Sequence, residues 1–221
     1  MLVGRNNMEV IYEDNHVIVV NKPAGIAVQA AKEGEEDLFV AVKKFIKERD
    51  NKPGNVFLGM VHRIDRPVSG LVMFAKTSKG ASRLSEQMRE GKIDKKYEAV
   101  VHGEIKNKKG RLENYLTKVK HNNGYKAIVT NDRNGDRSTL EYSVLETKDN
   151  YSRLGIDLET GRFHQIRVQL SYMGHPIVGD SLYGSKEKLT DNAIKLRAVK
   201  LEFNDVIEGD RISLKVPGFF L

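Results

Sequence analysis

The sequence predicts a mixed α+β fold, on two observations. Short segments rich in β-branched and aromatic residues recur along the whole chain, which is typical of strands. Between them, three segments repeat their apolar residues with helical period, and strands with a few interspersed helices indicate an α+β architecture. The 221 residues suffice for a packed core. Because no repeat or obvious interdomain linker is present, we expect a single domain over residues 1–221.

The first elements are a predicted hairpin and a helix. Residues 9–12 and 16–20 are β-rich, and the Glu-Asp-Asn between them is turn chemistry. Residues 38–49 have a helical period that ends at a Pro- and Gly-containing segment. Its apolar face consists of Leu38, Val42, Phe45 and Ile46.

The middle of the chain predicts strand, helix and strand. Residues 71–76 are apolar and indicate a buried strand. Residues 78–91 place Ala81, Leu84 and Met88 on one helical face, with Gly91 as the stop. Residues 95–103 alternate like a strand, with Tyr97, Ala99 and Val101 pointing one way.

The second half predicts further strands and one helix. Residues 106–136 are rich in Gly, Asn and Lys and suggest two or three strands, and residues 139–147 and 152–160 predict two more. Residues 163–176 switch to helical period and end at Gly174 and Pro176. The late strands are expected at residues 195–203 and 211–217.

The composition indicates a soluble protein with a polyanion partner. The net charge is +7, and residues 92–126 contain ten Lys or Arg against four Asp or Glu, so a net +6 lies there. Localised positive charge is typical of nucleic-acid binding, although a solvated basic face explains it equally well. There is no Cys, no signal-peptide core and no apolar run near the roughly 18 residues of a membrane span. We therefore expect a cytoplasmic protein.

The first segment with candidate chemistry is HRIDRPVSGL, residues 62–71, in which Asp65 lies between Arg63 and Arg66. It is not a kinase catalytic loop, because the glycine-rich loop and the other kinase motifs are missing. A carboxylate beside arginines is stabilised as the anion. Asp65 is therefore either part of a structural ion pair or a permanently ionised nucleophile or base.

The second segment is ETGRFHQIRVQLSYMGHPIVGDSLYG, residues 159–184. His164 and Arg167 are three residues apart and are predicted to share a polar helix face, opposite Ile166, Leu170 and Met173. Clustered donors at a helix start favour anions, but an ordinary amphipathic helix has the same pattern. A metal site is a weaker interpretation, because His164 and His175 lack ligand spacing with a carboxylate pair.

The third segment is KKYEAVVHG, residues 95–103, in which Tyr97 follows two lysines. A half-buried core tyrosine is the simpler interpretation of this residue taken alone.

Taken together, and in their order along the chain, the three segments resemble the RluA-type pseudouridine synthases. The family's H-R-L-D-x-x-T-S-G-L stands here as HRIDRPVSGL, its K-x-Y-x-A-x-V-x-G as KKYEAVVHG, and its G-R-T-H-Q-I-R-x-H-L-x-x-x-G-H-P-I-x-G-D-x-x-Y-G as GRFHQIRVQLSYMGHPIVGDSLYG. The opening EDNHVIVVNKPAGIAVQ also resembles the family's first strands. The likeness extends from about Glu9 to the last strands. The small N-terminal RNA-binding domain of many relatives is expected to be absent.

The chain departs from the family pattern at four positions. Pro67 and Val68 stand where the family often has another residue and Thr, Phe163 replaces a Thr, and Gln169 replaces a His. We expect these departures to bear on the fine choice of substrate and not on the type of reaction.

The resemblance implies an isomerase that converts uridine in RNA to pseudouridine, without cofactor or metal. It implies a mixed, mainly antiparallel central sheet with flanking helices and loops, and a catalytic cleft across the middle. Asp65 is the expected catalytic residue. The resemblance is compatible with attack on the sugar, attack on the base, or proton abstraction from the sugar.

Four further residues are expected to bind substrate. Arg63 would reach into the RNA and support the flipped uridine, whose removal from the stack costs a few kcal/mol. Tyr97 would stack on the uracil, Ile166 would line the pocket, and Arg167 would pair with Asp65 and keep it ionised.

The expected partner is ribosomal or transfer RNA, with a monomer as the default and no membrane association. The main alternative is a non-catalytic RNA-binding protein on the same fold. A hydrolytic glycosidase is a second alternative, but it needs two carboxylates. Asp180 is the only other candidate carboxylate, and it is expected to be a turn residue or buried cap.

Overall fold

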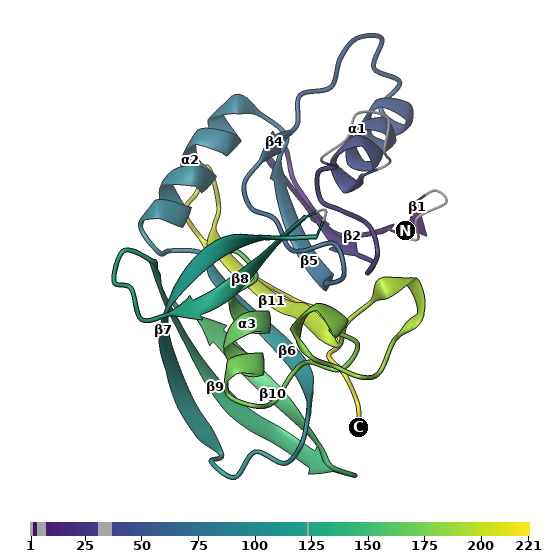
Figure 1. Ribbon diagram of the computed structural model, residues 1–221. Helices are drawn as coiled ribbons and strands as arrows, with labels where there is room; N and C mark the ends of the chain where they lie inside the picture. Colours follow the sequence, from purple (N-terminus) through teal and green to yellow (C-terminus); the bar gives the residue numbers. More distant parts are fainter. Residues whose placement is uncertain (1, 4–7, 31–36, 123) are drawn as a thin grey trace. The chain divides into compact units, whose positions relative to one another are not determined.

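The computed structural model describes residues 2–3, 8–30, 37–122 and 124–221. The chain folds into two compact units, Met1–Asp94 with Ala198–Val216 and Lys95–Arg197 with Pro217–Leu221. Each unit combines antiparallel strands with one or two helices (Figure 1). The predicted mixed, mainly antiparallel α+β class is confirmed.

The first unit contains most of the early strands and the last two. In sheet order the strands are β1 (Leu2–Val3), β2 (Met8–Glu13), β3 (Val17–Lys22), β5 (Ser69–Ala75) and β11 (Leu196–Asn204), with β4 (Gly59–Met60) beside β5 and β12 (Arg211–Lys215) beside β11. The apolar core of this unit is formed by residues from β3, β5, α2 and β11, among them Val19, Met73, Leu84 and Phe203. It is a sheet core, because alternate residues of each strand point to the same side.

The two helices of the first unit begin and end as the sequence predicts. Helix α1 (Leu38–Arg49) is capped by Asp37, whose side chain accepts a hydrogen bond from the Val40 amide. All four residues predicted on its apolar face are buried. Helix α2 (Ser78–Arg89) is capped by Thr77 and is followed by Gly91 at φ +67°, the left-handed conformation typical of a helix end.

The second unit is built on five antiparallel strands. In sheet order they are β6 (Asp94–His102), β10 (Tyr151–Leu158), β9 (Asp136–Lys148), β7 (Lys109–His121) and β8 (Gly124–Thr130). Helix α3 (Gln165–Tyr172) packs on the β7–β8 hairpin (Figure 1). Two short 3-10 turns follow, η1 (Ser181–Tyr183) and η2 (Thr190–Asn192). None of the helices among the described residues combines the length and the apolar character required to cross a membrane.

The predicted polar face of the helix at residues 163–176 is wrong. Helix α3 begins after His164, which has φ +54°, and all six residues from Gln165 to Leu170 are buried. Arg167 therefore lies inside the protein and not on a solvated outer face. The hydrophobic period identified the helix, but the helix is covered on several sides, so one apolar stripe did not describe its burial.

Candidate active site

Asp65 lies in the first unit, on the loop between β4 and β5. Ile64 and Val68 are buried and anchor this loop, while Asp65 is half-buried and Arg63 and Arg66 are exposed. The Val68 amide donates to the Asp65 carbonyl at 3.1 Å, which closes a turn around the carboxylate. The apolar residues therefore fix the loop, and its charged side chains remain accessible to a substrate.

A fully buried lysine supports this loop from the end of β3. Lys22 is 0% exposed, and its Nζ donates to the carbonyl oxygens of Pro23, Ile26 and Arg66 at 2.9, 2.8 and 3.1 Å. The Gly25 amide also donates to the Arg66 carbonyl, at 2.9 Å. These bonds tie the residues after β3 to the loop that carries the catalytic candidate.

Burial lowers the pKa of Lys22 to about 7, and the nearby Asp65 carboxylate opposes this lowering. The Lys22 ammonium, when charged, therefore attracts the Asp65 carboxylate. Lys22 is not among the site residues predicted from the sequence. The signal was present in NKPAG, residues 21–25, where a lysine follows an apolar strand directly.

His62 holds the other side of the Asp65 loop. Its Nε2 accepts a hydrogen bond from the Met73 amide of β5 at 3.1 Å. This contact requires the Nε2 lone pair, so His62 acts here as an acceptor that attaches the loop to the sheet.

Tyr97 lies in the second unit, in the middle of β6 and opposite Ile156 of β10. Its side chain is buried. Lys95 is two residues earlier on the same face of the strand, and burial lowers its pKa. A Cβ at Gly161 would lie 3.8 Å from Lys95 Nζ, so this face of β6 is close to the loop that leads into α3.

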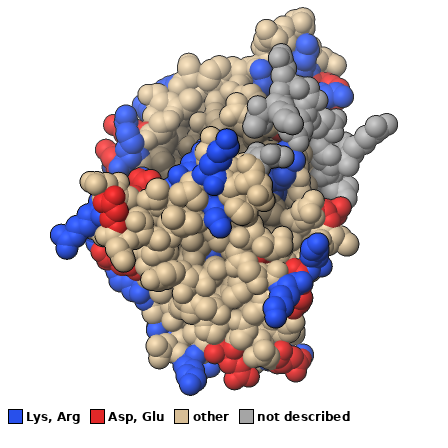
Figure 2. All heavy atoms as spheres, in the orientation of Figure 1, with Lys and Arg blue, Asp and Glu red and all other residues tan. Residues whose placement is uncertain are grey.

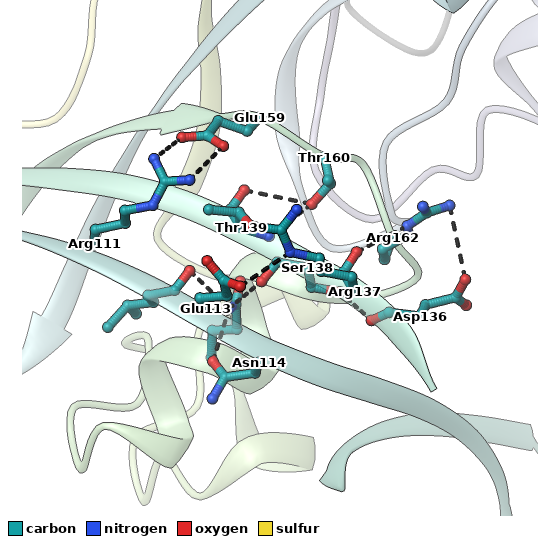
Figure 3. A network of polar contacts seen from close by, with 12 residues as sticks. Arg111, Glu113, Asn114, Asp136, Arg137, Ser138, Thr139, Glu159, Thr160 and Arg162 are labelled. Atoms are coloured by element: carbon teal, nitrogen blue, oxygen red, sulfur yellow. Dashed lines mark hydrogen bonds and ion pairs between the residues drawn. The ribbon is translucent and has the colours of Figure 1, made fainter. Parts of the chain in front are cut away.

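That loop, residues 159–164, is held on the sheet by polar contacts (Figure 3). Thr160 Oγ1 accepts from the Thr139 amide of β9 at 2.8 Å. Gln165 Oε1 accepts from the Arg162 amide at 3.0 Å, and Gln165 Nε2 donates to the Thr139 carbonyl at 3.1 Å. The start of α3 is therefore locked to β9, which positions Ile166 and Arg167.

Arg167 forms a buried, bidentate ion pair with Asp180. Its Nε and Nη2 donate to the two carboxylate oxygens at 2.7 and 2.9 Å, and the side chains of Arg167 and Asp180 are 6% and 1% exposed. The Tyr183 ring lies 5.0 Å from the guanidinium carbon. Asp180 is thus buried as expected, but its side chain caps no helix; it fixes the plane of the guanidinium. The pairing of Arg167 with Asp65 stays a prediction.

The four departures from the family pattern have different surroundings. Val68 and Gln169 are buried, and Gln169 Nε2 donates to Asn114 Oδ1 at 2.8 Å. Val68 therefore serves packing, and Gln169 joins α3 to β7. Pro67 is half-buried, whereas Phe163 is exposed.

The two histidines considered as metal ligands have other contacts. His164 Nδ1 lies 2.9 Å from the Tyr183 hydroxyl, and His175 Nδ1 lies 2.8 Å from the His102 carbonyl. Over the part of the chain that the structure describes, no group of three or more His, Asp or Glu side chains is arranged to hold a metal ion.

The basic segment is less uniform than its sequence suggests. Lys92, Lys96 and Arg111 form ion pairs with Glu90, Asp157 and Glu159. The other exposed lysines of the segment form two groups at opposite ends of β7. One group is Lys106, Lys108 and Lys109, and the other is Lys118 and Lys120. The two groups are about 30 Å apart along the strand. Figure 2 shows basic side chains in several separate groups on the face in view.

Comparison with known proteins identifies the family. Residues 16–172 match the family described as RNA pseudouridylate synthase. Ribosomal large subunit pseudouridine synthase C of Buchnera aphidicola (subsp. Acyrthosiphon pisum, strain APS) is 35% identical over 215 residues, which are 94% of this chain and 66% of the relative. Uncharacterized RNA pseudouridine synthase YlyB of Bacillus subtilis (strain 168) is 32% identical over 212 residues, 96% and 69% of the two chains.

Ribosomal large subunit pseudouridine synthase D of Zymomonas mobilis (subsp. mobilis, strain ATCC 31821 / ZM4 / CP4) is 36% identical over 183 residues, 82% of this chain and 57% of the relative. The chain thus spans 57 to 69% of the length of these three relatives. A solved structure, Human RNA Pseudouridylate Synthase Domain Containing 4, shares the fold with a TM-score of 0.77, 20% identity and coverage of 94% of this chain and 87% of that one. The chain belongs to the RNA pseudouridylate synthase family, whose members are isomerases that act on RNA.

Proposed function

We propose that this chain isomerises specific uridines of structured RNA to pseudouridine, with Asp65 as the essential carboxylate. The observation that carries the proposal is the Asp65 loop. Asp65 is half-buried at the start of a turn, beside exposed arginines and close enough to the buried Lys22 to interact with it electrostatically. A purely structural ion pair does not require the buried lysine and three backbone acceptors that hold this loop in place.

The reaction exchanges one bond of uridine for another. The bond from the sugar to ring nitrogen 1 breaks, the uracil turns, and a bond from the sugar to ring carbon 5 forms. The hydrogen on ring carbon 5 leaves as a proton, and nitrogen 1 gains one, so the product is an isomer. Asp65 would start cleavage as a nucleophile or by taking a proton from the sugar.

The other predicted site residues have surroundings that suit their roles. Arg63 is exposed and would enter the RNA to support the flipped nucleotide. Tyr97 would stack on the uracil, and Ile166 would supply an apolar wall. Arg167 would orient Asp65, and its own orientation is fixed by Asp180.

The names of two relatives favour ribosomal RNA of the large subunit as the substrate, with transfer RNA as the other candidate. We further propose that the protein works in the cytoplasm as a monomer and that residues 1–221 act as one catalytic domain. Mapping pseudouridine in total RNA from cells with and without the gene would identify the target as the site that is lost.

Asp65→Asn tests the function directly, because Asn is nearly isosteric with Asp. With RNA carrying tritium on ring carbon 5 of uridine, isomerisation releases the label to water. We expect release by the wild-type chain and by Asp50→Asn, which changes an exposed carboxylate of the same unit. We expect no release by Asp65→Asn at unchanged RNA affinity. Release by all three proteins would refute the role of Asp65, and RNA binding without release by any of them would favour a non-catalytic RNA-binding protein.

A further inference from the structure

Two exposed aromatic rings flank a lysine in the second unit, and none of these three residues has a role assigned to it above. Lys118 Nζ lies 4.2 Å from the ring centroid of Tyr125 and 4.9 Å from that of Phe163. The two rings are therefore at most about 9 Å apart. Tyr125 is 55% and Phe163 37% exposed. We call these three residues the aromatic–lysine cluster.

Strand alternation explains why the cluster is at the surface. Lys118 of β7 pairs with Ala127 of β8, and residues of one strand two apart share a face. On this face Leu116 and Ala127 pack against α3 and the turn at Tyr183. Lys118 and Tyr125 are the next residues of the same face, so they lie where the hairpin extends beyond its apolar contact with the helix.

The ring of Phe163 is held in place by the side chain of His164. Its ring stacks on the ring of His164 at 3.8 Å between centroids and 18° between planes. His164 has a left-handed backbone conformation, and its Nδ1 lies 2.9 Å from the Tyr183 hydroxyl, which also accepts from the Ala127 amide. The loop before it is fixed to β9 as described above (Figure 3). The exposed ring is therefore preorganised and adds little to the core.

The same contacts connect the cluster to the candidate active site within this unit. Tyr183 touches His164 on one side and the guanidinium of Arg167 on the other. Phe163 is thus two side chains away from Arg167. A nucleotide bound at Phe163 would neighbour one bound at the residues that line the uridine site.

We propose that Phe163 and Tyr125 form a stacking site for an unpaired nucleobase of the RNA substrate, with Lys118 binding the adjoining phosphate. Every base has a π-face that stacks on aromatic rings, and single-stranded RNA is bound by such rings next to basic side chains. Lys118 and the neighbouring Lys120 are both exposed and supply the positive charge. The inference rests on the proposed function, because it takes RNA as the substrate, and it assigns to Phe163 a base other than the target uracil.

The simpler explanation is that Lys118 only stabilises the hairpin, through its cation–π contacts with the two rings. The two explanations differ in what RNA binding requires. A hairpin contact affects folding alone, whereas a stacking site changes RNA affinity.

The test uses a stem–loop RNA with 2-aminopurine in its loop, beside a uridine, because the fluorescence of this base falls when it stacks. The chain has no Trp, so the signal comes from the RNA. We expect the wild-type chain to quench it. Phe163→Leu and Tyr125→Leu should each remove much of the quenching and weaken binding about 5- to 100-fold. Phe163→Tyr should keep both the quenching and the affinity, because tyrosine also stacks on a base. This variant therefore separates a loss of stacking from a folding defect.

Tyr172→Leu is the matched control, since Tyr172 is an exposed aromatic residue at the other end of α3. It should leave quenching and affinity unchanged. Lys118→Gln should reduce the slope of log affinity against log salt by about 0.7, whereas the aromatic substitutions should shift the line without changing its slope.

No quenching by the wild-type chain at low salt, or wild-type affinity and quenching in Phe163→Leu, would overturn the stacking site. A changed unfolding free energy with unchanged RNA binding would support the hairpin contact instead. Quenching that depends on Phe163, in a protein that releases no tritium, would refute the proposed function and leave the stacking site standing. Tritium release by the wild-type chain, together with unchanged quenching and affinity in Phe163→Leu, would support the proposed function and refute the stacking site.

Discussion

Replacing Lys22 with methionine removes the amino group that ties the end of β3 to the Asp65 loop, while keeping most of the side-chain volume. Lys22 Nζ donates to three carbonyl oxygens at 2.8 to 3.1 Å. The side chain is fully buried, so no water replaces the lost donor without rearrangement.

The expected change in stability depends on pH. Folding lowers the pKa of Lys22 from 10.5 to about 7, so between these values the unfolded chain binds more protons than the folded one. The free energy of unfolding therefore rises with pH in this window, by at most about 1.4 kcal/mol per pH unit. The methionine variant lacks this contribution, and the difference between the two proteins should grow by about 2.5 kcal/mol from pH 7.5 to 9.5.

The hydrogen bonds of Lys22 determine how large the loss of unfolding free energy is at a given pH. A neutral amine has two hydrogens, and each bond contributes about 1 kcal/mol net. We expect Lys22→Met to destabilise the protein by about 2 kcal/mol at pH 9.5. At pH 7.5 we expect almost no effect, because the lost hydrogen bonds are offset: Lys22 must give up a proton on folding at this pH, and Met does not.

Urea unfolding at both pH values measures these differences, and single-turnover tritium release measures the effect on Asp65. A displaced loop should lower the rate on the order of 10- to 100-fold with RNA affinity unchanged. Lys76→Met is the matched control, because Lys76 is also a poorly exposed lysine of this unit but binds the Asp14 carbonyl and Glu13. Equal destabilisation at both pH values would refute the lowered pKa, and a wild-type rate would refute the support of Asp65 by Lys22.

The remaining predictions concern the second unit. Arg167→Met should lower the single-turnover rate more than RNA affinity, because we expect it to misplace Asp65; a loss of affinity alone would make Arg167 a phosphate contact. Asp180→Ala should lower the free energy of unfolding by about 3–5 kcal/mol, since it leaves a buried guanidinium without its bidentate partner; a loss below 1 kcal/mol in urea unfolding would contradict this. Neutralising Lys108 and Lys109 together should flatten the salt dependence of RNA binding by about 1 to 1.5 in log–log slope at an unchanged saturated rate; superimposable salt curves would show that these lysines do not touch RNA.

Much of the secondary structure could be predicted from the sequence, because it depends on local patterns. The face of α1, the stop at Gly91 and the alternation of β6 follow from spacing and from single-residue backbone preferences. The segments around Asp65, Tyr97 and Arg167 also indicated the family, since their residues are contiguous in the chain.

The contacts that support the site required the tertiary structure. Lys22 meets the carbonyl of Arg66 across 44 positions, and Lys118 meets the ring of Phe163 across 45. The burial of Arg167 went against its polar character, and it is accommodated because Asp180, thirteen residues later, supplies both acceptors. Local spacing determines which residues share a face of a helix or strand, but which faces meet is decided by how the chain packs, and a buried charge is stable only where that packing brings its partner.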